Sequence, residues 1–191
     1  HEQAAAAVLR EENVCPWISV SSEIVQIMGE YERSSTTVVN AYVMPRVASY
    51  LTALSDRLAE MGLKPRLLML QSNGGAASLD QLIEQPVNLL LSGPSAGVGA
   101  MAHLARGLGE TNLVSMEIGG TSCDVMLMHE GRVAITDALS VNDYDLVTPS
   151  VDIHTVGAGG GTIAGIDAAG MMYAGPQGAG AVPGPAAYGL G

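Results

Sequence analysis

The feature that most constrains the fold of this chain is the uneven distribution of its glycines. Only Gly29 and Gly62 fall within residues 1–66, whereas the other 22 of the 24 glycines lie in residues 67–191. Glycine permits backbone conformations and close backbone approaches that a Cβ atom forbids. We therefore expect an ordinary helical first part, and a second part built from backbone loops of the kind that bind phosphorylated ligands.

The charge balance and the apolar content exclude several classes of protein. The formal net charge is -11, and the eight Lys and Arg residues are too spread out to form the basic stripe of a nucleic-acid-binding protein. With 48% hydrophobic residues, the composition is not that of a disordered chain. No apolar run approaches the roughly 18 residues of a membrane span, and no signal peptide is recognisable. We expect a cytoplasmic protein without nucleic-acid or membrane partners.

The first part is expected to be mainly helical. An alanine run predicts a helix over residues 3–12, and residues 17–21 are expected to form a short strand. A long helix is predicted over residues 35–61, with a kink or restart at Pro45. The apolar positions that recur at intervals of three and four in this helix are Val43, Val47, Tyr50 or Leu51, Leu54, Leu58 and Met61.

In the second part, short strands are expected to alternate with loops. A capping box at Ser78 and Gln81 predicts a short helix, and residues 92–104 are expected to form another. Glu130 and Gly131 suit a tight turn between two strands. The expected strands occupy residues 67–70, 87–91, 113–118, 123–128, 132–136, 152–156, 163–166 and 171–173.

The most informative motif is EIGGTSCD at residues 117–124, where two expected strands flank a glycine pair. The glycines would let the backbone approach a phosphate, and the hydroxyl and N–H groups that follow would complete a cradle. The residues of this expected phosphate loop are Gly119, Gly120, Thr121 and Ser122. Asp124 could hold a Mg²⁺ ion or a bridging water beside the phosphates. An ordinary tight hairpin would also explain the glycines, but the flanking acids, Glu117 and Asp124, favour a site.

A second glycine-rich motif, VDIHTVGAGGGT, occupies residues 151–162. Asp152 and His154 would lie on one face of a strand, where such a pair could bind a metal ion or move a proton. A structural role is open as well, in which His154 fixes the loop through a hydrogen bond. The glycines expected to approach the cofactor are Gly157, Gly159, Gly160 and Gly161.

Two further motifs allow a binding interpretation and a structural one. SGPSAG at residues 92–97 suits close helix–sheet packing or a ligand at a helix N-terminus, and packing is favoured. QSNGG at residues 71–75 follows an expected strand, where α/β sheets hold their sites, but a plain turn explains it equally. The tail from residue 175 is rich in Gly, Pro and Ala, and as a solitary linker it would be disordered.

Taken in order, six motifs resemble the hydantoinase A/oxoprolinase family over nearly the whole chain. They are YERSSTTVVNAY (31–42), QSNGG (71–75), SGPSAG (92–97), GGTSCD (119–124), DIHTVGAGGG (152–161) and GPAAYG (184–189). The resemblance implies an α/β fold, the actin-like ATPase (ribonuclease H-like) lobe with a mixed sheet. Since the family chain is several times longer, and this one starts at His1, we expect an internal segment and a partial domain.

The resemblance also implies a domain organisation and a site. Residues 1–66 would be a helical linking segment of the first lobe, and residues 67–191 the phosphate-loop lobe, with the second lobe starting near residue 113. The GGTS residues would form the second phosphate loop for ATP and Mg²⁺. The expected catalytic residues are Asp124, Glu117 and His154, and the expected metal ligands are Asp124 and Asp152.

By resemblance, the whole protein would open a cyclic amide of hydantoin or 5-oxoproline type by ATP-dependent phosphorylation of its carbonyl oxygen, together with a hydantoinase B-type partner subunit. A second hypothesis is an ATP-using subunit of an acetone- or acetophenone-type carboxylase. A third is a non-catalytic, nucleotide-dependent interaction module. The third is favoured only by Glu117, because the family usually has Asp at this position.

Overall fold

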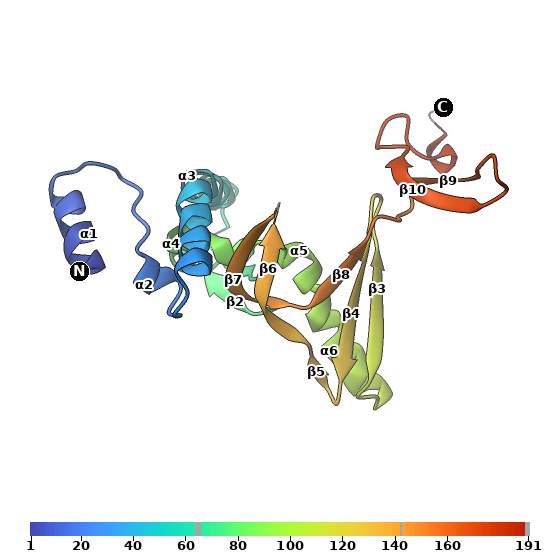
Figure 1. Ribbon diagram of the computed structural model, residues 1–191, viewed down its shortest axis with the longest axis horizontal. Helices are drawn as coiled ribbons and strands as arrows, with labels where there is room; N and C mark the ends of the chain where they lie inside the picture. The colour runs from blue at the N-terminus through green and yellow to red at the C-terminus, as the bar shows by residue number, and fades with distance from the viewer. Residues whose placement is uncertain (64–65, 142, 190–191) are drawn as a thin grey trace. The chain divides into compact units, whose positions relative to one another are not determined.

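The computed structural model describes residues 1–63, 66–141 and 143–189 (Figure 1). The chain forms two compact units, the first from His1–Ala96 with Ile135–Val151 and the second from Gly97–Ala134 with Asp152–Gly191. One boundary between the units falls after Ala96, and the domain boundary expected at residue 67 stays a prediction. The assignment of these parts to the lobes of a larger ATPase stays a prediction.

The first unit combines helices with two antiparallel hairpins. Its helices are α1 (Glu2–Glu11), α2 (Ser21–Ile24), α3 (Glu30–Glu60), α4 (Leu79–Glu84) and α5 (Ser92–Ser95), with a 3-10 helix η1 (Pro86–Leu89). Its strands are β1 (Leu68–Leu70), β2 (Ala76–Ser78), β6 (Ile135–Val141) and β7 (Tyr144–Val151). The expected long helix is confirmed and continues through Pro45. The capping box at Ser78 and Gln81 is confirmed as well.

Two expected strands of the first unit are wrong. Residues 17–20 form no regular element, and Ser21 begins α2. Residues 87–91 were expected to be a strand from their apolar run, but Pro86 starts a 3-10 helix there. The N–H of Val87 bonds to the side chain of Asn40, at 3.2 Å, instead of to a strand partner. The hairpin of β6 and β7, by contrast, was not expected beyond residue 136.

The buried face of α3 differs from the expected apolar stripe. Tyr50 and Met61 are exposed, whereas two polar residues, Thr36 and Asn40, have no exposed surface. The buried residues of the helix are Thr36, Asn40, Met44, Ala48 and Leu51. They follow the expected spacing of three and four, and Leu51 belongs to both sets. The expected Val43, Val47, Leu54 and Leu58 are half-buried, while the most buried positions before Leu51 lie one residue later, at Met44 and Ala48.

Asn40 connects α3 to the segment between α4 and η1. Its Nδ2 donates to the carbonyl of Glu84 at 3.1 Å and to the hydroxyl of Ser19 at 2.9 Å. Its Oδ1 accepts from the N–H of Val87. Buried backbone groups at a chain reversal need partners, and this one side chain supplies two of them.

The motifs QSNGG and SGPSAG meet in the same unit through buried serines. The Ser95 hydroxyl donates to the carbonyl of Ser72 at 2.8 Å, and Ser72 in turn donates to the carbonyl of Asn88 at 2.7 Å. Both serines are about 1% exposed. Their hydroxyls are used within the protein, which supports the structural interpretation of both motifs.

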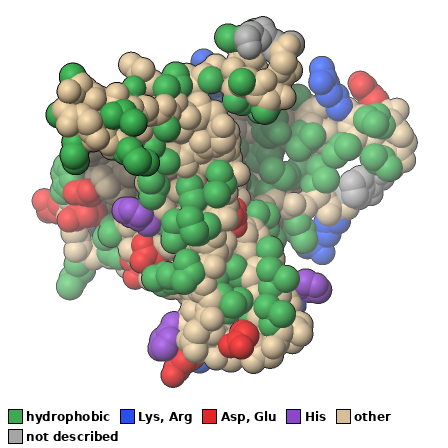
Figure 2. Space-filling model, turned by 90° about the vertical axis from the view of Figure 1, so that its right-hand side faces the viewer, with side chains coloured by type: hydrophobic (Ala, Val, Ile, Leu, Met, Phe, Trp, Pro, Cys, Tyr) green, Lys and Arg blue, Asp and Glu red, His purple; other side chains and the backbone are tan. Residues whose placement is uncertain are grey.

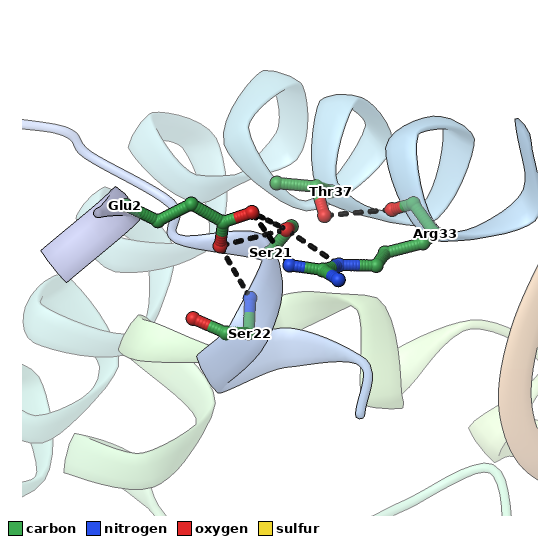
Figure 3. A network of polar contacts seen from close by, with 5 residues as sticks. All are labelled: Glu2, Ser21, Ser22, Arg33 and Thr37. Atoms are coloured by element: carbon green, nitrogen blue, oxygen red, sulfur yellow. Dashed lines mark hydrogen bonds and ion pairs between the residues drawn. The ribbon is translucent and has the colours of Figure 1, made fainter. Parts of the chain in front are cut away.

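The N-terminal helix is tied to α2 and α3 by the carboxylate of Glu2 (Figure 3). It accepts from the Ser21 hydroxyl at 2.8 Å and from the Ser22 N–H at 3.0 Å, and it pairs with Arg33 at 2.5 Å. The hydrogen bond from Ser21, followed by that from Ser22, lowers the pKa of Glu2 below its ordinary value.

The second unit holds one helix beside antiparallel strands (Figure 1). Its elements are α6 (Gly97–Leu108), β3 (Leu113–Ile118), β4 (Cys123–His129), β5 (Arg132–Val133), β8 (Ile153–Val156), β9 (Thr162–Ile166), β10 (Met172–Gly178) and a 3-10 helix η2 (Ala186–Tyr188). β4 lies between β3 and β8, and β9 pairs with β10. Glu130 and Gly131 have positive φ, as the expected tight turn requires.

The mixed sheet expected from the resemblance is not found. Every strand pair among the described residues is antiparallel. Most pairs join strands that follow each other through a few residues, and such short connections allow only antiparallel pairing. The helix expected over residues 92–104 is divided at Ala96 into α5 and α6.

Large apolar side chains remain exposed on the outer face of β3 and β4. Val114, Met116, Ile118 and Leu127 are 56% to 66% exposed. Figure 2 displays many hydrophobic side chains on the face that it draws. In the part of the chain that the structure describes, no helix has the length and apolarity needed to span a bilayer.

The role of Asn40 leads to a stability prediction. Asn40→Ala should lower the free energy of unfolding by about 3 kcal/mol, because the buried N–H of Val87 and the carbonyl of Glu84 lose their partner. Thermal unfolding of the full-length protein should record a fall of several degrees. Asn73→Ala is the matched control: Asn73 is exposed and accepts only one local bond, from Gly75. Equal unfolding temperatures for the two variants would contradict the assigned role.

Candidate phosphate-binding site

The two glycine-rich motifs of the second unit lie against each other. The first glycine loop, residues 119–122, joins β3 to β4, and the second glycine loop, residues 157–161, joins β8 to β9. The N–H of Gly160 donates to the carbonyl of Gly119 at 2.9 Å, and that of Gly161 donates to Gly120 at 2.7 Å. The structure therefore brings together two loops that the sequence separates by more than thirty residues.

Gly159 lies at the closest point of this contact. A Cβ atom at position 159 would be 2.7 Å from the carbonyl oxygen of Gly119 and 2.8 Å from the backbone nitrogen of Ser122. Such distances to backbone atoms are too short for any side chain. A Cβ at Gly157, in contrast, would have no atom within 4 Å. The glycine run thus serves a close backbone contact at position 159 and not at 157.

The contact determines which polar groups the first glycine loop presents. The carbonyls of Gly119 and Gly120 are taken by the second loop, and the N–H of Gly119 bonds to the carbonyl of Ser122 at 2.8 Å. Within the described ranges, no acceptor is found for the N–H groups of Gly120, Thr121 and Ser122. Successive free N–H groups in a turn form an anion-binding concavity. The second loop therefore occupies two carbonyl oxygens of the first loop. The N–H groups of Gly120, Thr121 and Ser122 remain available to an anion.

Two carboxylates and a hydroxyl form a row beside this loop. Glu117 on β3 is directly opposite Asp124 on β4, and Asp124 is directly opposite Thr155 on β8. Residues paired across strands project from the same face of a sheet, so the three side chains are neighbours. The Thr155 hydroxyl donates to Oδ1 of Asp124 at 2.6 Å.

The Glu117 end of the row is packed against the start of α6. A Cβ at position 97 would overlap Oε1 of Glu117, so Gly97 leaves the space that this carboxylate occupies. Burial, and secondly the charge of Asp124, raise the pKa of Glu117 above its ordinary value. Both causes favour the protonated form of the Glu117 carboxyl.

The structure does not bring every expected site residue to this row. His154 is paired with Val125, so its side chain projects from the opposite face of the sheet to Asp124 and Thr155. Asp152 precedes β8, and its N–H bonds to the carbonyl of Ala134 at 2.9 Å. The catalytic role of His154 and the metal role of Asp152 stay predictions.

The donor set fits a nucleotide-bound Mg²⁺ better than a metal held by protein alone. Among the described residues there is no group of three His, Cys, Asp or Glu that could hold a metal ion. Mg²⁺ in nucleotide sites commonly has one or two carboxylate ligands, and phosphate oxygens and waters complete its octahedron. Asp124, half-buried beside the first glycine loop, fits that requirement.

Three contributors to the site were missed by the sequence analysis. Gly97 and Thr155 belong to recognised motifs, but their partners depend on packing and on strand register. The third is the tail from residue 175, which contributes to β10, forms η2 and walls a pocket of about 230 Å³. The pocket is lined by Gly120, Thr121, Gly161, Thr162, Pro176, Gly178, Gly180, Ala181, Pro185 and Tyr188.

Comparisons with known proteins identify the family of the chain. Residues 33–191 match the family described as Hydantoinase/oxoprolinase. The chain is 37% identical over its whole length to the caprolactamase subunit alpha of Pseudomonas jessenii, and 34% identical over its whole length to the acetophenone carboxylase gamma subunit of Aromatoleum aromaticum. It spans 27% of the length of each relative.

A solved structure is similar as well. The crystal structure of the ATP-dependent caprolactamase from Pseudomonas jessenii superposes with a TM-score of 0.84 and 36% identity, over the whole of this chain and 28% of that one. Identity in sequence and likeness in fold therefore extend over the same residues. The chain belongs to the hydantoinase/oxoprolinase family.

Proposed function

We propose that the chain carries the second phosphate-binding loop of an ATP-dependent enzyme that phosphorylates the carbonyl oxygen of a cyclic amide. The observation that carries the proposal is the row of free N–H groups at Gly120, Thr121 and Ser122 beside the carboxylate of Asp124. A metal–nucleotide complex has a negative phosphate and a positive metal ion. The N–H groups would bind the phosphate oxygens, and the carboxylate would bind the cation.

In this mechanism the chain's residues position and neutralise charge. The amide oxygen attacks the γ-phosphorus and ADP leaves. Water then adds to the activated carbon and the C–N bond breaks, so that the ring opens to an amino acyl phosphate. A second water hydrolyses this acyl phosphate to the amino acid and phosphate. The N–H groups of residues 120–122 hold the γ-phosphate oxygens as charge shifts during transfer. Asp124 would hold the Mg²⁺, which neutralises charge on the phosphates.

The cyclic amide is favoured over a ketone on the similarities. The caprolactamase relative is slightly more identical than the carboxylase relative, 37% against 34%, and the caprolactamase structure superposes over the whole chain. This difference in sequence identity places the cyclic amide before the ketone as the expected substrate. The test therefore has separate outcomes for a carboxylase subunit and for a nucleotide-dependent interaction module.

The test is phosphate release from ATP by the full-length protein with its partner subunit. Caprolactam, 5-oxoproline and hydantoin, and separately acetone and acetophenone, are each supplied with and without bicarbonate. Stimulation by a cyclic amide alone is expected. A requirement for both ketone and bicarbonate would move the protein to the carboxylases. Nucleotide binding without stimulation by any of them would favour the interaction module.

Asp124→Asn tests the metal-binding end of the site. The substitution keeps the size of the side chain and removes its charge, so ATP turnover should fall by at least about 100-fold while the unfolding temperature changes little. Turnover and thermal unfolding are measured on the full-length protein. Near-normal turnover would remove Asp124 from the site.

Gly159→Ala and Gly157→Ala form a matched pair that tests the contact between the loops. A methyl group at 159 pushes the first glycine loop out of position, and a misplacement of about 1 Å can cost on the order of 100-fold in rate. Gly159→Ala should lower substrate-stimulated ATP turnover by about tenfold or more. Gly157→Ala meets no atom and should stay within about twofold of the wild type. Similar losses in both variants would mean that the contact is not what positions the loop.

A further inference from the structure

We propose that Thr155 is the positioning residue of the site: its hydroxyl fixes the direction of the Asp124 carboxylate beside the first glycine loop. The proposal rests on the proposed function, since it assigns to Thr155 a role in the same phosphate site. Thr155 itself lies outside the set of residues that would touch the nucleotide or the metal.

The bond between the two residues has the geometry of a charge-assisted contact. The distance from the Thr155 hydroxyl to Oδ1 of Asp124 is 2.6 Å, within the roughly 2.5–2.7 Å range for a hydroxyl that donates to a carboxylate. In the described part of the chain, no other side chain donates to Asp124. One carboxylate oxygen is thereby held, and the other is left for a cation.

Threonine suits this task because its side chain is stiff. A β-branched residue on a strand has few χ1 states, so the pairing of β8 with β4 determines where the hydroxyl points. The register is set over four consecutive pairs, from Cys123 with Val156 to Met126 with Ile153. The direction of the Asp124 carboxylate is thus tied to the backbone of a neighbouring strand.

The neighbour on the other side makes no hydrogen bond to Asp124 among the described residues. Glu117 is the residue opposite Asp124 on β3, and a second carboxylate repels the first when both are ionised. Without the Thr155 hydroxyl, Asp124 would keep no side-chain donor in the described part of the chain. Its carboxylate would then sample several rotamers, of which only some face a metal beside the loop.

The same bond lies between the bases of both glycine loops. Thr155 comes two residues before Gly157, and Asp124 comes two residues after Ser122. Farther out, the loops are joined by backbone bonds at Gly160 and Gly161. The side-chain bond and the backbone bonds together fix the acid and the N–H groups relative to each other.

Three variants of the full-length protein test the proposal. Thr155→Val keeps the branched shape and removes the hydroxyl, whereas Thr155→Ser keeps the hydroxyl. Loss of an outer-shell partner of a metal ligand commonly costs 10- to 100-fold. We expect Thr155→Val to lower kcat about tenfold or more and to raise the Mg²⁺ concentration needed for nucleotide binding, measured by calorimetry. Thr155→Ser should stay within about threefold of the wild type, and thermal unfolding should be nearly unchanged in both.

The third variant, Asp124→Asn, separates positioning from a purely structural role. Once the carboxylate is gone, adding Thr155→Val should cost nothing further in kcat. Equal effects of Thr155→Val in both backgrounds, or equal losses for Thr155→Val and Thr155→Ser, would overturn the proposal. Should Thr155→Val fail to fold, Thr155→Ala with Thr155→Ser gives the same comparison. If Asp124→Asn alone has no effect, the proposed function fails, and this outcome is distinct from a failure of the Thr155 assignment.

Discussion

The close contact between the two glycine loops is the constraint on which the second unit depends. Gly159 approaches the backbone of residues 119–122 to within a distance that excludes any Cβ atom. The contact requires β8 to lie beside β4, and that pairing brings Thr155 to Asp124. It also uses the carbonyls of Gly119 and Gly120, while the N–H groups of Gly120, Thr121 and Ser122 have no acceptor among the described residues. The glycine content of the motif follows from this geometry, and the second loop supports the site by shaping the first.

Part of the site could be predicted from the sequence because it is local. The EIGGTSCD motif contains the adjoining ends of both strands, the turn and both acids, so the pairing of Glu117 with Asp124 follows from a short hairpin. The contribution of β8 was harder to predict from the sequence, because β8 pairs with β4, which is distant along the chain. A slip of one residue moves every side chain to the other face, and the sequence does not determine that register. For this reason His154 was expected near the acids, whereas Thr155 is the residue that meets Asp124.

The first unit was harder to predict because polar side chains organise its core. Asn40 and Thr36 are fully buried, and hydrophobic periodicity places such residues on the surface. Thr36 accepts from the N–H of Val147 on β7, at 2.9 Å, and so ties α3 to a hairpin that the sequence analysis missed. The apolar run after Pro86 was taken for a strand, but its first N–H bonds to Asn40 and it turns instead. Local propensity fails where a distant side chain supplies the hydrogen bonds of the backbone.

Glu117 stands where the family usually has Asp, and the structure has room for its longer side chain. The longer side chain reaches toward Gly97, where the missing Cβ leaves space for it, so its additional methylene does not need to displace Asp124. Asp124 is held from the opposite side by Thr155, on a different strand from Glu117. The change from the usual Asp therefore affects only the Glu117 position, beside α6. Asp124, which is proposed to meet the metal, keeps its hydrogen bond from Thr155. This separation favours the catalytic interpretation over a nucleotide-binding module without chemistry.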